Sequence, residues 1–231
     1  MALAGLGLTR TFHQGETTVR AVDGVSLTVD AGELVVVNGP SGSGKSTLLH
    51  LLGGLDRPDA GRVLLEGEDL SRLTERQLAL VRRRRIGFLL QFFSLLPTLT
   101  VLENVALPLL LDGASHARAR AEEALRRTGV AQRRAHRPGT LSGGEQQRAA
   151  LARAIVTNPA VLLADEPTGS LDSASGQRIF ELLREVAADT GVIVVSHDPR
   201  AAGYADRVVH LADGRVVVPE PHAPLASSRP R

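Results

Sequence analysis

The sequence predicts an α/β fold built on a mostly parallel sheet, and two patterns carry that prediction. Three apolar runs, Leu34–Asn38, Val161–Ala164 and Val192–Val195, have the length and the β-branched content of strands that are buried on both faces. Helical patterns lie between these runs, and strands that alternate with helices are typical of parallel sheets. A chain of 231 residues suffices for one such domain with a buried core.

The segments around these runs add shorter elements. Residues 3–10 and 25–30 are expected to form short strands, with turns at Asp23-Gly24 and at 30–32. Apolar clusters predict further strands at 63–66, 86–91 and 216–218. Helical patterns occupy residues 71–85 and about 173–188.

A long helical block lies between the predicted strands at 86–91 and 161–164. Residues from about 92 to 155 are mostly helical in pattern, with amphipathic spacing at 115–128 and 145–156. Because this block interrupts the alternation of strands and helices, it is interpreted as an inserted helical subdomain. Residues 1–218 would form one domain, and the Pro-, Ser- and Ala-rich residues 219–231 are expected to be disordered.

Composition excludes several classes of protein. There is no cysteine, which excludes disulfides and cysteine metal sites. No segment approaches the roughly 18 apolar residues of a membrane span, and no signal peptide pattern is present. We therefore expect a protein on the cytoplasmic side of the cell membrane that docks on a membrane partner. The net charge of +2 does not indicate nucleic acid, and Lys45 is the single lysine among 27 basic residues.

A glycine-rich loop around Lys45 fits the pattern G-x-x-x-x-G-K-[ST]. It lies between a buried strand run and an apolar helix, and it consists of Gly39, Pro40, Ser41, Gly42, Ser43, Gly44, Lys45, Ser46 and Thr47. Glycines allow backbone N–H groups to surround phosphate oxygens, and the helix N-terminus faces the same anion. Lys45 would reach the β- and γ-phosphates, and Ser46 would offer its hydroxyl to Mg²⁺. The pattern indicates a nucleoside triphosphate site rather than a chance loop.

Two carboxylates, Asp165 and Glu166, follow the apolar run 161–164. Ligands of parallel α/β sheets bind at the carboxyl ends of the strands. Asp165 is therefore predicted to hold Mg²⁺, directly or through water, and Glu166 to polarise the attacking water. The alternative is a solvated acidic turn, which the phosphate loop on the same sheet makes less favourable.

The segment 141–148, Leu-Ser-Gly-Gly-Glu-Gln-Gln-Arg, predicts a second anion site. Ser142, Gly143 and Gly144 place small side chains and free N–H groups at the start of a helix. Ser142 could also be an ordinary N-cap, with Glu145 completing a capping box, and both interpretations can hold together. A second anion site far from the first is explained if it serves the nucleotide of another subunit.

With these motifs in this order, residues 3–218 resemble the ABC ATPase family. The resemblance implies a P-loop NTPase (RecA-like) core with a mostly parallel sheet, an N-terminal antiparallel β subdomain and an inserted helical subdomain, and it implies ATP and Mg²⁺ as cofactors. Phe12 matches the family aromatic that stacks on adenine, which is more often Tyr. Gln91 matches the glutamine that contacts Mg²⁺ and senses the membrane partner. Asp172 matches the loop that signals across the dimer, and His197 the histidine near the γ-phosphate.

A narrower resemblance rests on the segments 53–58, 86–88, 91–93 and 95–100. They are similar to the branch that contains the lipoprotein-releasing and macrolide-exporting ATPases and the ATPase that regulates cell-wall hydrolysis at division. This resemblance implies a partner permease with few membrane spans and a large extracytoplasmic domain. The surface around residues 91–100 is the expected docking site, with apolar side chains that could also belong to the core.

The predicted mechanism is a head-to-tail homodimer with two-fold symmetry. ATP would lie between the phosphate loop of one protomer and residues 142–145 of the other, and its binding would drive a membrane permease. Lys45, Glu166 and His197 are the predicted catalytic residues. The alternative is a soluble ABC ATPase that acts on nucleic acid or ribosomes, as the basic run Arg82–Arg85 could suggest. A solvated helix face explains that run more simply, so no nucleic acid partner is expected.

Overall fold

The computed structural model describes residues 1–15, 17–91 and 93–217. A six-stranded sheet has the order β10-β9-β3-β8-β7-β6, in which the strands from β9 to β6 run parallel and β10 runs antiparallel at the edge. Its strands are β3 (Leu34–Asn38), β6 (Ile86–Leu89), β7 (Val161–Asp165), β8 (Gly191–Val195), β9 (Arg207–Ala212) and β10 (Arg215–Val217). The predicted α/β fold with a mostly parallel sheet is therefore confirmed.

The central strands are buried on both faces, as their continuous apolar runs predict. Alternate side chains of β3, such as Val36, pack with α3 to α6, while Val35 and Val37 pack with α1 and the second sheet. The same alternation in β7 and β8 completes two core clusters on opposite sides of the sheet. Strand β8 lies between β3 and β7, and the three parallel strands end at the same edge of the sheet.

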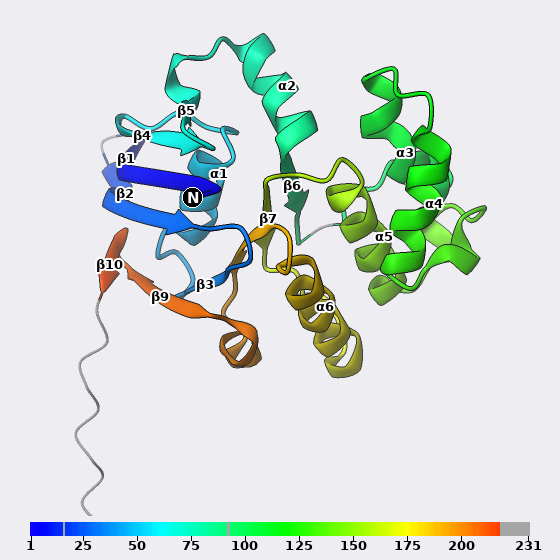
Figure 1. Cartoon of the computed structure of the whole chain (residues 1–231). Helices are drawn as coiled ribbons and strands as arrows, with labels where there is room; N and C mark the ends of the chain where they lie inside the picture. The colour runs from blue at the N-terminus through cyan, green and yellow to red at the C-terminus, as the bar shows by residue number, and fades with distance from the viewer. Residues whose placement is uncertain (16, 92, 218–231) are drawn as a thin grey trace, which may run out of the picture.

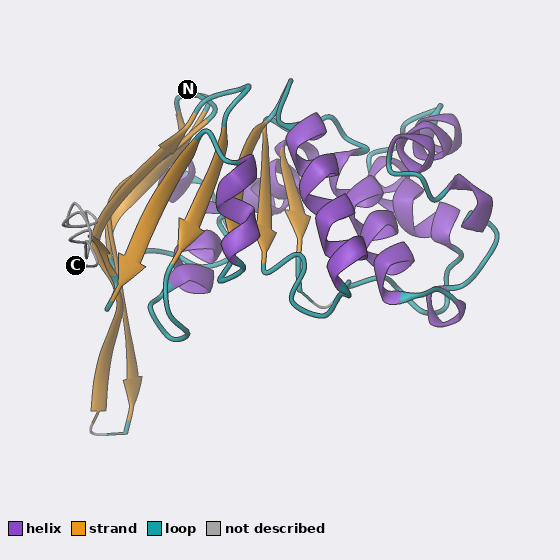
Figure 2. Cartoon of the chain, turned by 90° about the horizontal axis from the view of Figure 1, so that it is seen from below, coloured by secondary structure: helices purple, strands orange, loops and turns teal. Residues whose placement is uncertain are grey.

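The second sheet is antiparallel and contains β2 (Thr17–Val29), β1 (Leu3–Gln14), β4 (Ala60–Leu65) and β5 (Glu68–Asp69) in that order. The predicted turn at Asp23-Gly24 is wrong, because both residues lie inside β2. Between the pairs Leu8↔Val25 and Arg10↔Val22 the register shifts, and Gly24 has φ of +67°. A β-bulge absorbs the turn-like residues and lets the strand continue. The resulting long hairpin extends away from the body of the molecule (Figure 2).

The helices lie in two groups (Figure 1). Those that accompany the sheets are α1 (Lys45–Leu52), α2 (Glu75–Arg85) and α6 (Ser173–Val186). Those inserted between β6 and β7 are α3 (Val101–Leu111), α4 (Ala117–Arg127) and α5 (Gly143–Ile155). The predicted insertion is thus present, but its first helix begins at Val101 rather than near residue 92. Short 3₁₀ helices occupy Leu70–Arg72, Ala131–Arg133, Pro138–Thr140 and Pro199–Tyr204.

Capping residues explain where these helices begin. Capping boxes stand at the starts of α2, α3 and α5, with Thr74, Thr100 and Ser142 as the N-caps. The predicted helix at 71–85 is therefore divided, since Thr74 starts a new helix after the 3₁₀ turn. Strand β9 was not predicted, because its side chains are mostly half-buried. The predictions for Val218 and residues 219–231 lie outside the described residues.

The basic run at the end of α2 is not a simple solvated face. Arg82 donates to Gly54 O, Arg83 and Arg84 pair with Asp112, and Arg85 pairs with Glu66 and Glu68. These contacts connect α2 with the end of α3 and with the antiparallel sheet. Among the helices in the described ranges, none combines the length and apolar character needed to cross a bilayer.

Candidate functional site

A cleft of about 540 Å³ collects side chains from five separate segments. It is lined by Ala21, Ser41, Gly42, Gly44, Lys45, Ser46, Thr47, Gln91, Glu166 and His197. The phosphate loop therefore meets the predicted residues that follow β6, β7 and β8. They meet because the carboxyl ends of neighbouring parallel strands lie at one edge of the sheet.

The phosphate loop is shaped by positive backbone angles. Gly42 has φ of +79° and Gly44 has φ of +97°, conformations that glycine adopts without steric cost. Helix α1 then begins at Lys45, and none of the described side chains caps its N-terminus. Its first N–H groups therefore point toward the loop and can bind an anion.

Lys45 is nearly buried, with 7% of the residue exposed. Its Nζ donates to Gly39 O and Pro40 O, each at 2.8 Å. These two carbonyls hold the ammonium group against the loop, so a positive charge is fixed beside the N-terminus of α1. The combination suits a polyphosphate, because charge and N–H donors face the same space.

Asp165 and Ser46 come together although they lie far apart in the sequence. Ser46 Oγ donates to Asp165 Oδ1 at 3.0 Å. Burial raises the pKa of Asp165 above its ordinary value, and the hydrogen bond from Ser46 partly opposes that shift. A carboxylate, a hydroxyl and the Gln91 amide are oxygen ligands of the kind that Mg²⁺ prefers, so this set fits that ion.

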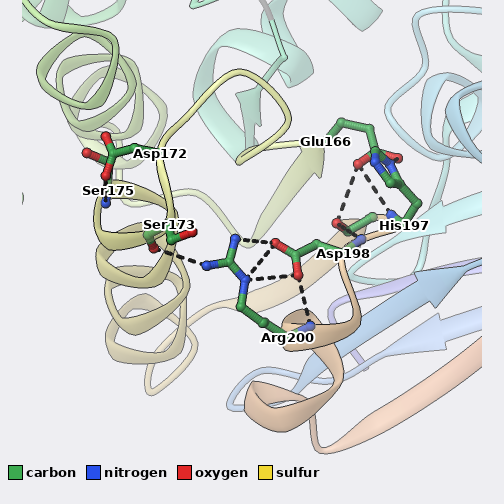
Figure 3. A network of polar contacts seen from close by, with 8 residues as sticks. Glu166, Asp172, Ser173, Ser175, His197, Asp198 and Arg200 are labelled. Carbon is green, nitrogen blue, oxygen red and sulfur yellow. Dashed lines mark hydrogen bonds and ion pairs between the residues drawn. The ribbon is translucent and has the colours of Figure 1, made fainter.

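Glu166 is held in a strained conformation with φ of +44°. Its N–H donates to Val195 O at 2.9 Å, which fixes the backbone beside β8. The carboxylate meets the loop after β8 (Figure 3), with Oε1 lying 2.9 Å from His197 Nδ1. Oε2 accepts from His197 N at 3.3 Å and from Ser196 Oγ at 3.4 Å.

Glu166 and His197 differ in how far their side chains are exposed, and this difference shows where each lies in the cleft. The Glu166 side chain is 15% exposed and the His197 side chain is 69% exposed. Glu166 therefore lies at the base of the cleft, where a polar group can act on a water molecule. His197 lies at the open side, where it can contact a ligand that enters.

The loop that carries His197 is also tied to the start of α6 (Figure 3). Arg200 pairs with Asp198 at 2.7 Å, and its Nη1 donates to Ser173 O at 3.0 Å. Asp172 caps α6 by accepting from Ser175 N at 2.9 Å. Hydrogen bonds from the backbone and side chain of Ser175 lower the pKa of the Asp172 carboxyl group. Asp172 is not among the described residues that line the cleft.

The segment Ser142–Glu145 likewise lies outside the lining of the cleft in the described part of its own chain. Ser142 and Glu145 form the capping box, with Ser142 N donating to Glu145 Oε2 at 2.9 Å. Arg133 Nε donates to Glu145 Oε1 at 2.8 Å. Arg133 and the Ser142 backbone lower the pKa of Glu145 to about 2. The carboxylate stays charged and holds the start of α5, where Ser142 is exposed.

Comparison with known proteins identifies this arrangement. A family model described as "ABC transporter" matches residues 22–169, which is more than half of the chain. The chain belongs to the ABC transporter family. The predicted resemblance is thereby confirmed, and the protein is an ATPase of the ABC type.

Relatives of this ABC ATPase are similar to it in sequence over nearly the whole chain. The lipoprotein-releasing system ATP-binding protein LolD of Geobacter metallireducens is 50% identical over 216 residues, which is 92% of this chain and 96% of that protein. An uncharacterized ABC transporter ATP-binding protein of Thermotoga maritima is 49% identical over 208 residues, 89% of each chain. The predicted similarity to the lipoprotein-releasing branch is confirmed by the first of these relatives.

Solved structures carry the same fold. One is described as the dimeric structure of a post-hydrolysis state of the ATP-binding cassette MJ0796 bound to ADP and Pi. It has a TM-score of 0.85 at 41% identity and covers 93% of this chain and 96% of its own. The fold class predicted for this ABC ATPase is therefore also that of a solved relative.

Phe12 of this ABC ATPase lies on β1, beside the cleft rather than among its described lining residues. Its cross-strand partner on β2 is Val19, and Ala21, two residues further along β2, lines the cleft. The Phe12 residue is 39% exposed, so part of the ring is open to a ligand. The structure thus places Phe12 at the edge of the same site.

Gln147 is a residue of this ABC ATPase to which the sequence analysis assigned no role. It is 1% exposed, and its Nε2 donates to Pro167 O at 2.9 Å and to Leu90 O at 3.4 Å. Helix α5 is thereby bonded to the residues that adjoin Glu166 and Gln91. The sequence does contain a sign of this role, because Gln147 is a polar residue three and four positions before the apolar Ala150 and Leu151, which places it on the same buried face of the helix.

Proposed function

We propose that this ABC ATPase is the ATP-binding and ATP-hydrolysing subunit of a transporter, in which two copies close around ATP and drive a separate membrane permease. The observation that carries the proposal is the cleft itself. It joins a fixed ammonium group at Lys45, the Ser46–Asp165 pair and the Glu166–His197 pair. Each of these groups suits a different part of a hydrolysable nucleoside triphosphate.

The triphosphate would lie over the phosphate loop. The N–H groups at the start of α1 and the Lys45 ammonium stabilise negative charge on the phosphates. Ser46, Gln91 and Asp165 would hold Mg²⁺, which supplies charge neutralisation for the phosphates when it is bound. The adenine base would stack on Phe12 at the edge of the cleft.

Glu166 would orient the water that attacks the γ-phosphate. The strained backbone and the contacts with Val195 and Ser196 hold its carboxylate in place before a ligand arrives. His197 contacts Glu166 and remains largely exposed, so it can bind the γ-phosphate from the open side. Positioning and charge stabilisation, rather than covalent chemistry, account for hydrolysis.

The N-terminus of α5 supports the dimer in this proposal. Ser142 is exposed and Gly143 half-buried at the start of this helix, and both lie outside the lining of their own cleft in the described chain. In a two-fold dimer each such segment would face the nucleotide of the other copy. Two solved relatives, at 41% and 42% identity, are titled as dimeric structures, and one holds ADP and Pi. Asp172, at the start of α6, would lie between the copies.

A groove of about 380 Å³ is the feature that supports binding of a protein partner. Its apolar lining includes Leu55, Phe88, Leu107, Pro108 and Leu111, and both Leu55 and Leu111 are exposed. Exposed apolar grooves are typical of interfaces, and here we assign the groove to a cytoplasmic segment of the permease.

Arg153 connects this groove with the residues after Gln91. It lines the groove, and its Nη1 donates to Ser94 O at 2.6 Å. The nearby Leu95 packs on the core of the helical subdomain, whereas Leu96 is exposed, and Phe92 lies outside the described residues. Arg153 therefore joins the groove to Ser94, three residues after Gln91, and we propose that binding of the permease acts on Gln91 through this segment.

The relatives named LolD, which are lipoprotein-releasing system ATP-binding proteins, support a permease that releases or exports lipoproteins. We propose that this permease has a large extracytoplasmic domain and that the ATPase binds it on the cytoplasmic side of the membrane. The alternative of a soluble ATPase on nucleic acid loses its main support in the structure. Arg82–Arg85 are engaged in contacts within the chain rather than presented as a free basic face.

The test uses the Glu166→Gln variant, with Glu181→Gln as the matched control on an exposed face of α6. With ATP and Mg²⁺, Glu166→Gln should bind ATP, lose nearly all turnover and elute as a dimer, while the control behaves as the wild type. Tagged Glu166→Gln protein loaded with ATP should also retain a membrane permease from solubilised host membranes. Normal turnover of Glu166→Gln would remove Glu166 from catalysis, and recovery of ribosomes without a permease would refute the transport role.

A further inference from the structure

The segment that follows α1 lines no part of the cleft, although residues 53–58 carry part of the resemblance to the lipoprotein-releasing branch. Two carboxylates of this region, Asp56 and Asp59, both face Arg10 on β1. Arg10 Nη1 donates to Asp59 Oδ1 at 2.9 Å. Arg10 Nε lies 2.9 Å from Asp56 Oδ2 as an ion pair, without the alignment of a hydrogen bond. The guanidinium group is thus fixed from two sides.

This fixed guanidinium group lies over the Phe12 ring. The Arg10 Cζ atom is 5.0 Å from the ring centroid, which is within the range of a cation–π contact. Asp59 also accepts the N–H of Thr11 at 2.7 Å, so the backbone between Arg10 and Phe12 is restrained as well. One face of the ring is covered by the cation, and the ring keeps part of its surface exposed.

We propose that Arg10, held by Asp56 and Asp59, is a positioning residue that fixes the Phe12 ring as a platform for the purine base of the nucleotide. This inference rests on the proposed function, because it assumes that ATP occupies the cleft. Phenylalanine has no hydroxyl group that could anchor the ring by a hydrogen bond. The covered face supplies that anchor, and the other face is left for the base.

The ion pair with Asp56 also connects Arg10 to the segment that follows α1. Helix α1 begins at Lys45 in the phosphate loop and ends at Leu52, shortly before Asp56. A rigid helix therefore links the phosphate site at its start to the base platform beyond its end. The separation between the two parts of the nucleotide site is set by this helix and the Arg10 contacts, before the nucleotide binds.

The experiment compares binding of ATP with binding of tripolyphosphate, which has the phosphates and no base. Arg10→Met should raise the Kd for ATP about 2- to 5-fold, which corresponds to roughly 0.5–1 kcal/mol of cation–π restraint, and leave the Kd for tripolyphosphate unchanged. Arg10→Lys should restore most of the affinity, because it keeps the cation. The exposed Arg72→Met, which breaks a surface ion pair with Asp69, is the matched control and should change neither constant.

Two further variants separate positioning from a general loss of structure. In a Phe12→Ala background, Arg10→Met should cause no additional loss of ATP affinity, because Arg10 acts through that ring. The double variant Asp56→Asn/Asp59→Asn keeps Arg10 but releases it, and should also weaken ATP binding selectively.

Equal weakening of ATP and tripolyphosphate by Arg10→Met, or an additive effect in the Phe12→Ala background, would overturn the inference. If wild-type protein binds ATP and Arg10→Met binds it equally well, the inference alone fails. Wild-type protein that binds neither probe would refute the proposed function as well.

Discussion

Replacing Gly44 with alanine should cost more stability than replacing Gly39 or Gly42, although all three glycines belong to the phosphate loop. A Cβ at Gly44 would lie 1.9 Å from Ala21 O, and the residue has φ of +97°. A Cβ at Gly39 would lie 2.1 Å from Leu211 O, without a positive φ. At Gly42 φ is +79°, and no described atom lies within 4 Å of the added Cβ. The three positions therefore separate steric conflict from backbone strain.

The magnitudes follow from these two contributions. Left-handed backbone costs an alanine about 1–2 kcal/mol, and the lost freedom of the unfolded chain returns about 0.4–1 kcal/mol. Gly42→Ala should therefore destabilise by about 1 kcal/mol. A backbone conflict of this depth adds about 1–3 kcal/mol, so Gly44→Ala should lose about 3 kcal/mol and Gly39→Ala an intermediate amount. For a chain of this size, about 3 kcal/mol corresponds to a fall in Tm of roughly 6–12 °C.

The assay is thermal unfolding of the three variants and the wild type, followed by circular dichroism without nucleotide. Omitting the nucleotide isolates the folded loop from effects on binding. The expected order of Tm is wild type, Gly42→Ala, Gly39→Ala and then Gly44→Ala. If Gly44→Ala were as stable as Gly42→Ala, the loop would not be packed against β2, and the steric reasoning would be refuted.

Three other changes test contacts around the site. Gln147→Leu removes the donor to Pro167 O and should lower kcat for ATP hydrolysis about tenfold with little change in the Kd for ATP, whereas an unchanged kcat would contradict a role in holding Glu166. Because the pKa of Glu145 falls from its ordinary 4.5 to about 2, its charge stabilises the fold above pH 4.5, and this contribution disappears as pH falls toward 2. Glu145→Gln should therefore flatten the pH dependence of stability between pH 5 and about 2 in denaturant titrations, and an unaltered profile would exclude this carboxylate. Asp112→Asn should destabilise by about 1 kcal/mol at low salt and by less at high salt, since it weakens the ion pairs that join α2 to α3.

Local structure was predictable wherever a short segment decides its own conformation. The run at 34–38 becomes β3 with the same bounds, because a short run rich in β-branched apolar residues is typical of a strand that is covered on both faces. The capping box of Ser142 and Glu145 forms as the spacing predicts, since its hydrogen bonds span three residues. The phosphate loop is equally local, as its glycines provide the positive angles themselves.

Predictions were wrong where a segment depends on distant neighbours. Asp23-Gly24 has the composition of a turn, but pairing with β1 turns it into a bulge inside β2. Strand β9 has only half-buried side chains for the most part, and it forms because β3 offers a free parallel edge. In both cases the partner strand, which the segment itself does not encode, decides the structure.

The sequence by itself therefore determined the phosphate loop, the buried strands, the capping box at the start of α5 and the family resemblance, because these depend on residues within a few positions of one another. Only the tertiary structure decided that Ser46 meets Asp165 and that Glu166 meets His197, and only it gave Gln147 and Arg10 their partners. Those contacts join segments far apart in the chain. They arise from the order of strands in the sheet and from the packing of helices, which no local pattern records.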